Sequence, residues 1–257
     1  KTALASLVHA ADVPTARDRS KRGCPIECVG QRPALDQLLK LGYVPAQSQA
    51  WGGAAETLEQ ASADFALAAF AQRLGDDATS ARFLERAGNW RHLFNPRATP
   101  TGGYIQNRNA DGTWPAFDPA SDDGFVEGSA AQYLWMVPFD VRGLFDALGG
   151  SERASARLDA FFHDEDGAWA LTGLGGLHAE MDNEPSLAAP WLYAYAGEPW
   201  KTQATVRAVV NTLWQPTPDG IPGNDDLGEM SSWYVWSALG MYPLFPALGR
   251  ASCRERV

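Results

Sequence analysis

Cysteine, basic charge and long apolar runs are all scarce in this sequence. Its cysteines, Cys24, Cys28 and Cys253, are too few for an all-cysteine zinc site, and we expect them to be inert, with a local Cys24–Cys28 disulfide left open. The formal net charge of −10 argues against nucleic acid as the main partner. No apolar run approaches the ~20 residues of a membrane-spanning helix, and no signal peptide is visible.

Alternation of strands with helices is also lacking, which argues against a parallel α/β sheet. Apolar residues instead recur at helical spacing in paired segments. The clearest pair, 57–74 and 78–94, is joined by a Gly-Asp-Asp turn at 75–77 and predicts a helical hairpin. Further helices are expected over 35–43, 127–135, 141–149, 152–162, 187–195, 200–214 and 229–242. The pattern predicts an all-α protein, a toroid of helical hairpins with a pocket at one end.

One long segment, 95–123, breaks the helical pattern with several prolines and glycines. Residues Tyr104–Gln106 are expected to form a short strand, closed by a turn at Asp111–Gly112. A loop this long in a compact domain is usually functional or acts as a lid.

The two ends of the chain differ in character from its middle. Residues 1–34 comprise a helix tail and a basic loop, 17–32, to which we assign no function; a solvated loop and a sequence error both stay open. Residues 35–248 are expected to form a partial catalytic domain. Residues 249–257 have no apolar period and reverse the local charge, so we expect a tail that is not native to the protein.

Tryptophan is abundant, with ten residues. Aromatic rings beside carboxylates suit sugars, which offer an apolar face and a rim of hydroxyls, and core packing is the alternative for each ring. Several tryptophans lie in loops or near acidic stretches: Trp51, Trp114, Trp135, Trp169, Trp191 and Trp200.

Three acidic stretches stand out, and we expect them to form one pocket. They are 124–129, which holds Glu127; 178–185; and 223–228, which holds Asp225 and Asp226. The first and last place carboxylates beside glycines at junctions between loops and helices. Loops on a rigid scaffold often carry binding and catalytic residues.

These residue types suit the cleavage of a glycosidic bond, which needs a general acid and a second carboxylate. Glu127 suits the acid: an apolar environment would raise its pKa, whereas a helix N-terminus would lower it, and both stay open. Asp225 and Asp226 suit the base, with a solvated turn that caps the next helix as the alternative. Asp182, Asn183 and Glu184 offer the hard oxygens that calcium prefers, although a helix N-cap would explain them equally well.

Together, these stretches resemble the α-mannosidases of glycoside hydrolase family 92 over roughly residues 35–246. The motifs that carry the resemblance lie in the expected order along the chain. They are Gly124–Ser129 with Gln132, Tyr133 and Trp135; Val137–Val141; Gly149–Gly150; Asn183–Ser186; Tyr193–Gly197; Pro199–Trp200; and Gly223–Tyr234.

The resemblance implies an (α/α)6 barrel that removes terminal α-linked mannose from glycans, N-glycans among them, by inversion and with the help of Ca2+. Glu127 matches the general acid, and the Asp225–Asp226 pair matches the region of the general base. Asn183 and Glu184 match calcium ligands, joined by a carbonyl from Asp182. The residues expected to bind substrate are His178, Glu180, Gln132 and Asp140.

Two positions depart from the family pattern: Ser129 stands where Asn is usual, and Phe139 where His is frequent. Neither change removes a carboxylate. The family also carries an N-terminal β-sandwich domain that completes the active site, so this chain is expected to be a fragment that could be inactive alone. The family further implies a secreted or periplasmic protein. Another inverting helical-toroid glycosidase, such as an α-glucosidase, or a non-catalytic sugar-binding fragment are the alternatives.

Overall fold

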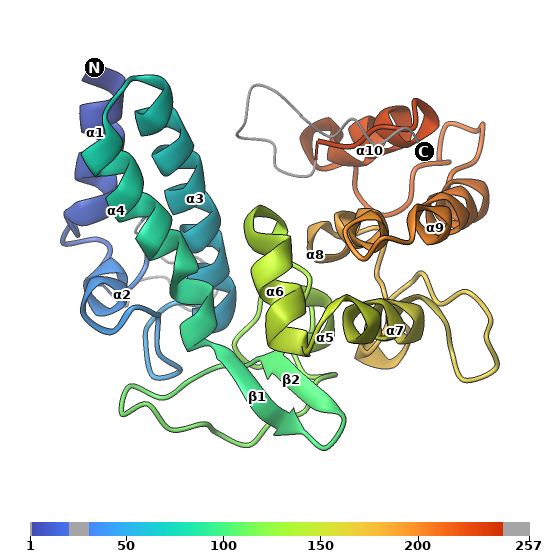
Figure 1. Cartoon of the computed structure of the whole chain (residues 1–257), viewed down its shortest axis with the longest axis horizontal. Helices are drawn as coiled ribbons and strands as arrows, with labels where there is room; N and C mark the ends of the chain where they lie inside the picture. Colours follow the sequence, from blue (N-terminus) through green and yellow to red (C-terminus); the bar gives the residue numbers. More distant parts are fainter. Residues whose placement is uncertain (1, 21–30, 244–257) are drawn as a thin grey trace. The chain divides into compact units, whose positions relative to one another are not determined.

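The computed structural model describes residues 2–20 and 31–243 of the 257-residue chain and divides the chain into two compact units, Lys1–Ala130 and Ala131–Val257 (Figure 1). The described residues are mostly helical, with one two-stranded sheet, which confirms the predicted all-α class with a short hairpin. A single catalytic domain over 35–248 stays a prediction. The three cysteines, most of the basic loop and the tail 249–257 lie outside the described residues.

The first unit contains four α-helices, one 3₁₀ helix and one β-hairpin among its described residues. These elements are α1 (Thr2–Asp12), α2 (Leu35–Leu41), α3 (Gly53–Arg73), α4 (Asp77–Ala87), η1 (Gly88–His92), β1 (Phe94–Thr99) and β2 (Gly102–Ile105). Helices α3 and α4 form the predicted helical hairpin. Asp76 caps α4, because its carboxylate accepts hydrogen bonds from the N–H and the hydroxyl of Thr79 (3.1 and 2.8 Å). None of the described helices is long and apolar enough to cross a membrane.

Helix α3 begins at Gly53 rather than at the predicted Thr57. The hydroxyl of Thr57 donates to the Gly53 carbonyl (2.8 Å) and accepts the N–H of Val44 (2.9 Å) inside the helix. The free N–H groups at the helix start donate instead to the carbonyl of Gly124, from Ala54 (2.9 Å) and Ala55 (3.1 Å). The acidic stretch 124–129 is thereby fixed to the beginning of the longest helix of this unit.

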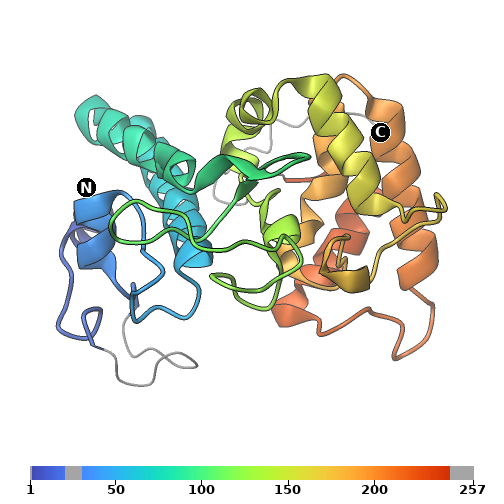
Figure 2. The same cartoon turned by 90° about the horizontal axis from the view of Figure 1, so that it is seen from below.

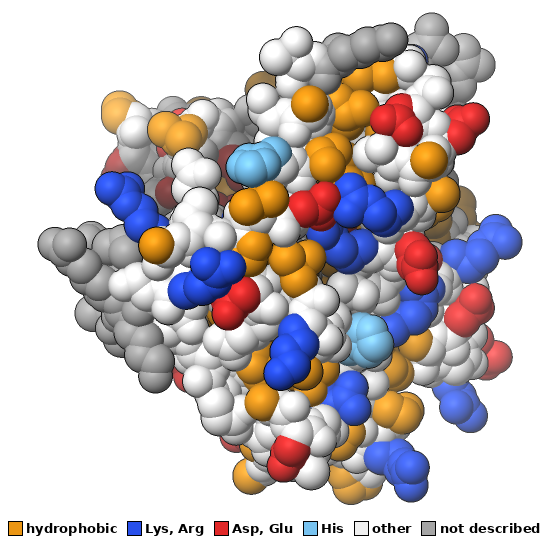
Figure 3. Space-filling view, turned by 90° about the vertical axis from the view of Figure 1, so that its left-hand side faces the viewer, with side chains coloured by type: hydrophobic (Ala, Val, Ile, Leu, Met, Phe, Trp, Pro, Cys, Tyr) orange, Lys and Arg blue, Asp and Glu red, His pale blue; other side chains and the backbone are white. Residues whose placement is uncertain are grey.

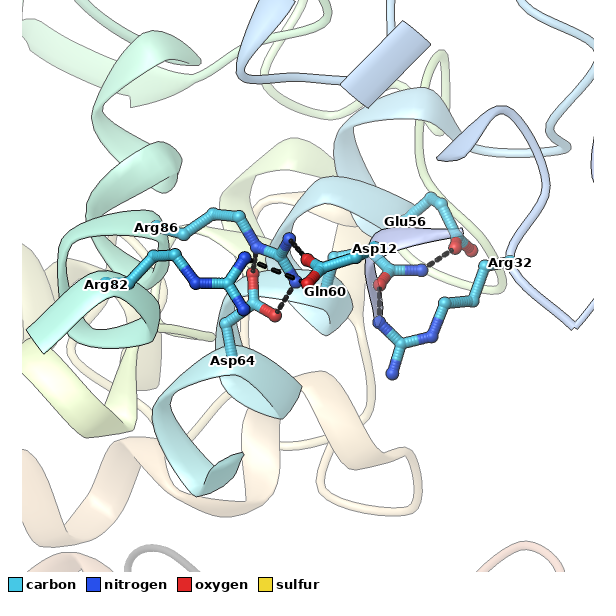
Figure 4. Close-up of polar contacts among 7 residues, drawn as sticks. All are labelled: Asp12, Arg32, Glu56, Gln60, Asp64, Arg82 and Arg86. Atoms are coloured by element: carbon cyan, nitrogen blue, oxygen red, sulfur yellow. Dashed lines mark hydrogen bonds and ion pairs between the residues drawn. The ribbon is translucent and has the colours of Figure 1, made fainter. Parts of the chain in front are cut away.

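A partly buried ion cluster joins α1, α3 and α4 (Figure 4). The guanidinium of Arg86 binds both carboxylate oxygens of Asp64, each at 2.5 Å, and donates to Asp12 at 3.0 Å. Arg82 forms a second ion pair with Asp12, at 2.9 Å. Asp64 is only 1% exposed, so its charge depends on the bidentate contact with Arg86.

Strands β1 and β2 pair antiparallel, with Phe94 opposite Ile105 and Asn95 opposite Tyr104. The strand predicted at 104–106 is therefore real, but the expected closure at Asp111–Gly112 is wrong, because the strand pairs with the residues before it. A loop follows from 106 to 129, drawn in green in Figure 2. On the face shown in Figure 3, basic side chains are interspersed with acidic and apolar ones.

The second unit continues with short and medium helices. They are α5 (Ala130–Tyr133, which begins at the unit boundary), η2 (Pro138–Asp140), α6 (Val141–Leu148), α7 (Ser151–Phe162), η3 (Leu174–Gly176), α8 (Glu184–Leu187), η4 (Ala189–Ala194), α9 (Pro199–Leu213), η5 (Asp226–Gly228) and α10 (Glu229–Ala238). Two predictions need correction. The helix expected from residue 127 forms only over α5, and the one expected over 187–195 is divided between α8 and η4.

Stacked indoles and a charged cluster hold these helices together. Trp214, which follows α9, stacks on Trp233 of α10 (5.1 Å between centroids), and the Trp233 indole N–H donates to the Leu187 carbonyl (2.9 Å). Lys201 of α9 binds Asp159 of α7 at 2.7 Å. The two contacts of Trp233 fix α10, the helix that follows the Asp225–Asp226 stretch.

Candidate active site

Glu127 lies in a tight turn ahead of α5 and not in a helix. Its φ is +50°, a left-handed conformation that few non-glycine residues adopt. The residues just before Glu127 are closely packed. Phe125 is 3% exposed, and a Cβ on Gly124 would lie 2.6 Å from Cγ of Asn107. The carboxylate of Glu127 is exposed, so the fold presents it at the surface of the first unit on a well-anchored loop.

The Asp225–Asp226 stretch divides its two carboxylates between different environments. Asp225 Oδ1 accepts hydrogen bonds from the N–H (3.0 Å) and hydroxyl (2.8 Å) of Ser231. The Asp225 carbonyl also accepts the N–H of Gly228 (3.0 Å). Asp225 therefore caps the helix that follows it, which is the alternative to a role as general base. No hydrogen bond to the Asp226 carboxylate occurs within residues 2–20 and 31–243.

The backbone at Asp226 and Leu227 is strained. Their φ angles are +44° and +58°, and the Leu227 side chain is fully exposed. Of the described non-glycine residues, only four have positive φ, and three of them are Glu127, Asp226 and Leu227. Such conformations cost about 1–3 kcal/mol each and concentrate at functional sites. Strained backbone therefore occurs in both loops that the sequence predicts to carry the general acid and the general base.

The stretch 178–185 lies beside the Asp225–Asp226 loop in the second unit. A Cβ placed on Gly223, whose φ is +58°, would lie 2.9 Å from the carbonyl oxygen of Asp182. Asn183 caps α8, because its side-chain oxygen accepts the N–H of Glu184 (3.1 Å). The expected alternative, a helix N-cap, is therefore confirmed for this contact of Asn183. Two of the three acidic stretches are therefore adjacent.

The expected substrate-binding residues Gln132, His178 and Glu180 also come together. The amide of Gln132 donates to the His178 carbonyl and to the Glu180 carboxylate, both at 3.2 Å. His178 Nδ1 is buried and without a hydrogen-bond partner in the described structure. Burial raises the pKa of Glu180, the Asp182 carboxylate adds to the rise, and the bond from Gln132 opposes it.

Asp140, the fourth residue expected to bind substrate, has a structural contact. Its carboxylate caps α6 by accepting the N–H of Gly143 (3.1 Å).

The tryptophans near the acidic stretches fall into two groups. Trp135 and Trp191 are buried, which favours core packing for them. Trp51, Trp169 and Trp200 are 44%, 40% and 59% exposed.

The acidic residues of the second unit suit a hard cation. Among the described residues, no three His, Cys, Asp or Glu side chains form a metal-binding group, but calcium also accepts carbonyl and amide oxygens. Burial raises the pKa of Glu229, and the nearby Glu184 and Asp226 carboxylates raise it further. No Lys or Arg forms an ion pair with these three carboxylates in the part of the chain that is described.

Two features of the site were missed in the sequence. Ser231 holds Asp225 across six residues, a spacing that matches no standard capping motif. Leu227 gave no signal either, because a left-handed leucine looks like any exposed apolar residue in a sequence. Gly223 was noticed as a glycine, but its neighbour Asp182 is distant in the chain.

Comparison with known proteins identifies the class. A sequence model of the glycosyl hydrolase family 92 catalytic domain matches residues 1–250. The chain therefore belongs to glycosyl hydrolase family 92, which confirms the resemblance and extends it to residues ahead of position 35.

Three relatives illustrate the relationship. A family GH92 inverting mannosidase from Bacteroides thetaiotaomicron VPI-5482 is 33% identical, with a TM-score of 0.76 over 96% of this chain and 33% of its own. A GH92 α-mannosidase from Bacteroides thetaiotaomicron is 35% identical, with a TM-score of 0.72 over 83% of this chain and 27% of its own. An uncharacterized secreted glycosidase of Arthroderma benhamiae is 30% identical over 82% of this chain and 29% of its own. The chain spans about a third of the length of these relatives.

Proposed function

We propose that the protein containing this chain is an exo-acting α-mannosidase that releases terminal α-linked mannose from glycans with inversion of configuration. Membership of family 92 supports glycoside hydrolysis, and the two mannosidases named above support mannose as the sugar. The observation that carries the residue assignment is the left-handed backbone at Glu127 and Asp226. Each strained turn presents an exposed carboxylate beside glycines. Glycoside hydrolysis uses a pair of carboxylates, and strained backbone concentrates at functional sites.

In this proposal, Glu127 is the general acid. It donates its proton to the glycosidic oxygen as the bond to the anomeric carbon breaks, so that the leaving sugar departs as a neutral alcohol. The hydrogen bonds from the start of α3 to the Gly124 carbonyl limit the movement of the turn that carries Glu127. The result is a carboxyl group with a defined direction on a rigid support.

Asp226 is the general base in the same proposal, with Asp225 as a positioning residue. Asp226 takes a proton from a water molecule, which attacks the anomeric carbon from the face opposite the leaving group. The two hydrogen bonds from Ser231 to Asp225 hold the loop in shape. For inversion, the carboxyl groups of Glu127 and Asp226 should lie ~6.5–9.5 Å apart, leaving room for the water.

We further propose that Asn183, Glu184 and the Asp182 carbonyl hold Ca2+. When bound there, Ca2+ would supply a positive charge that helps to orient the hydroxyl groups of the sugar. Gln132, His178 and Glu180, which the hydrogen bonds of Gln132 join, would contact the sugar. Asp140 stays a substrate-binding proposal alongside its capping role.

Two proposals concern the whole protein. The family's N-terminal β-sandwich domain would complete the active site as a partner of this chain. The secreted relative from Arthroderma benhamiae supports export from the cell.

The test is hydrolysis of an α-mannoside by the full-length natural protein, followed by proton NMR. Inversion predicts that β-mannose appears first and then mutarotates. Glu127→Gln and Asp226→Asn should each lower kcat by about 10²–10⁴-fold, whereas Glu165→Gln and Asp219→Asn, at exposed positions, should leave it unchanged. Early release of α-mannose would refute inversion. Binding of mannose without any hydrolysis would favour the non-catalytic alternative, and preference for an α-glucoside would favour the other glycosidase.

A further inference from the structure

Glu180, one of the residues proposed to contact the sugar, lies in a short antiparallel pairing of two segments of the second unit. It stands opposite Thr172 in an isolated bridge. The two hydrogen bonds of this bridge join the residues on either side of the pair: the Gly173 N–H to the Ala179 carbonyl (2.9 Å) and the Met181 N–H to the Leu171 carbonyl (3.0 Å). In such a pair, the N–H and the carbonyl of the central residue point away from the partner segment. The backbone N–H of Glu180 therefore needs a partner elsewhere.

The side chain of Ser186 is that partner. Its hydroxyl oxygen accepts the Glu180 N–H at 3.1 Å, and Ser186 is only 1% exposed. The Glu180 carbonyl accepts the N–H of Asn183 (3.2 Å), so both polar groups of the Glu180 backbone are bound by the residues that follow it. Ser186 is itself held in place, because the carbonyl of the next residue, Leu187, accepts the indole N–H of Trp233 (2.9 Å).

The direction of the Glu180 carboxylate depends on this backbone bond. The carboxylate accepts the amide of Gln132 (3.2 Å), and Gln132 is 2% exposed. On its other side the carboxylate lies close to the backbone of Gly173, where an added Cβ would come within 3.0 Å of the Glu180 Cδ. A rotation of the Glu180 backbone would therefore break the bond from Gln132 and turn the carboxylate away.

We propose that Ser186 is a positioning residue for the reaction and acts through Glu180. The inference rests on the proposed function, in which Glu180 contacts the sugar. A hydrogen bond from a sugar hydroxyl to a carboxylate weakens steeply as its distance and angle depart from the ideal. Ser186 does not touch the sugar in this proposal, since it is buried and its hydroxyl oxygen binds the Glu180 backbone.

The test is a double-mutant cycle in the full-length natural protein, with kcat/KM for an α-mannoside and Tm measured for every variant. Ser186→Ala should lower kcat/KM by about tenfold or more. In a Glu180→Ala background the same change should have little further effect on kcat/KM, because no carboxylate is left to position.

Two further variants separate positioning from packing. Ser186→Cys nearly preserves the volume but accepts hydrogen bonds weakly, so it should lose kcat/KM as Ser186→Ala does, and it replaces the alanine variant if that protein does not fold. Ser155→Ala is the matched control in the same unit. Ser155 is 4% exposed, and its hydroxyl donates to Glu198 and accepts from Lys201, so its loss should lower Tm and leave kcat/KM unchanged.

Additive losses in the two backgrounds would overturn the proposal, as would wild-type kcat/KM in Ser186→Cys or in Glu180→Ala. If the wild-type protein cleaves no α-mannoside, the proposed function fails, and calorimetric titration with mannose then tests Ser186. Mannose affinity that falls about tenfold in Ser186→Ala and not in Ser155→Ala supports positioning. Absent binding of mannose, or equal affinity in the two variants, refutes it.

Discussion

Gly223 lies directly against Asp182: a methyl group at Gly223 would come within 2.9 Å of the Asp182 carbonyl oxygen and 3.0 Å of its Cβ. This contact joins the stretch proposed to hold the base to the stretch proposed to hold calcium. Residues separated by some forty positions thus share one side of the second unit. Only glycine both fits this space and adopts the φ of +58° without strain.

Gly223→Ala should therefore reduce activity by displacing one stretch from the other. A displacement of about 1 Å can lower the rate about a hundredfold. Gly167→Ala is the matched control, because Gly167 has a similar φ of +80° with nothing within 4 Å of an added Cβ. Both variants carry the same backbone cost, and only Gly223→Ala should lose kcat. Equal kcat in the two proteins would show that the contact has no bearing on catalysis.

The roles of Asp225 and Asp226 can be separated by conservative substitution. Asn at 225 retains an oxygen that accepts both bonds from Ser231, so Asp225→Asn should keep most of the activity that Asp225→Ala loses. Asn at 226 cannot take a proton from water, so Asp226→Asn should lower kcat by about 10²–10⁴-fold. The measurement is kcat at saturating α-mannoside. The reverse order, with Asp225→Asn the more damaging, would make Asp225 the base.

The sequence predicted the helical segments well where apolar residues recur over many turns. The hairpin of α3 and α4, the proline start of α9 and the glycine end of α2 all follow from local rules. The start of α3 at Gly53 does not follow from local rules, because the N–H groups of Ala54 and Ala55 donate to the distant carbonyl of Gly124. Long-range backbone contacts leave no local signature in a sequence.

The candidate site was predictable as a set of residues but not as a geometry. Glu127 beside glycine suggested a helix start, whereas the structure places it in a left-handed turn with φ of +50°. A propensity argument favours helix for glutamate, and the packing of Phe125 and Gly124 overrides it. The division of labour between Asp225 and Asp226 likewise depends on Ser231, whose side chain reaches back across a turn.

Removal of calcium should lower both activity and thermal stability. A ligand present at a hundred times its Kd stabilises the folded protein by about 2.7 kcal/mol, so chelation should lower Tm measurably and added Ca2+ should restore it. Glu184→Gln should abolish the calcium-dependent rise in Tm, whereas Glu165→Gln should retain it. A Tm and a turnover that chelation leaves untouched would contradict the calcium proposal.

The ion cluster of the first unit should contribute to stability through Arg86 rather than Arg82. Arg86→Ala leaves Asp64 buried without its partner, which should cost about 3–5 kcal/mol in the free energy of unfolding. Arg82→Ala removes a pair whose arginine side chain is 50% exposed, worth about 0–1 kcal/mol. Both guanidiniums also lie over the Phe83 ring, at 4.3 and 4.5 Å, so that contact cancels in the comparison. Urea denaturation measures the difference, and equal losses would show that burial of Asp64 is unimportant.

Glu56 should make stability depend on pH in a direction opposite to that of most carboxylates. Burial raises its pKa above the ordinary 4.5, against the hydrogen bond from Gln60. The charges around it divide, because Glu59 and Asp18 raise the pKa and Arg32 lowers it. A carboxyl group with a raised folded-state pKa stabilises the fold fully below the unfolded pKa, and this contribution is lost as pH rises through the folded value.

Glu56→Gln should therefore raise Tm at pH 7, where Glu56 would otherwise carry a half-buried charge. The glutamine keeps an oxygen for the bond from the Gln60 amide, which measures 2.6 Å in the structure, so only the charge is removed. The gain should shrink as pH falls toward 4.5 and below, because Glu56 is then protonated. Glu59→Gln, at an exposed position on the same helix, serves as the control and should show a smaller change across this range. A gain in Tm that is constant with pH would mean that ionisation of Glu56 does not oppose folding.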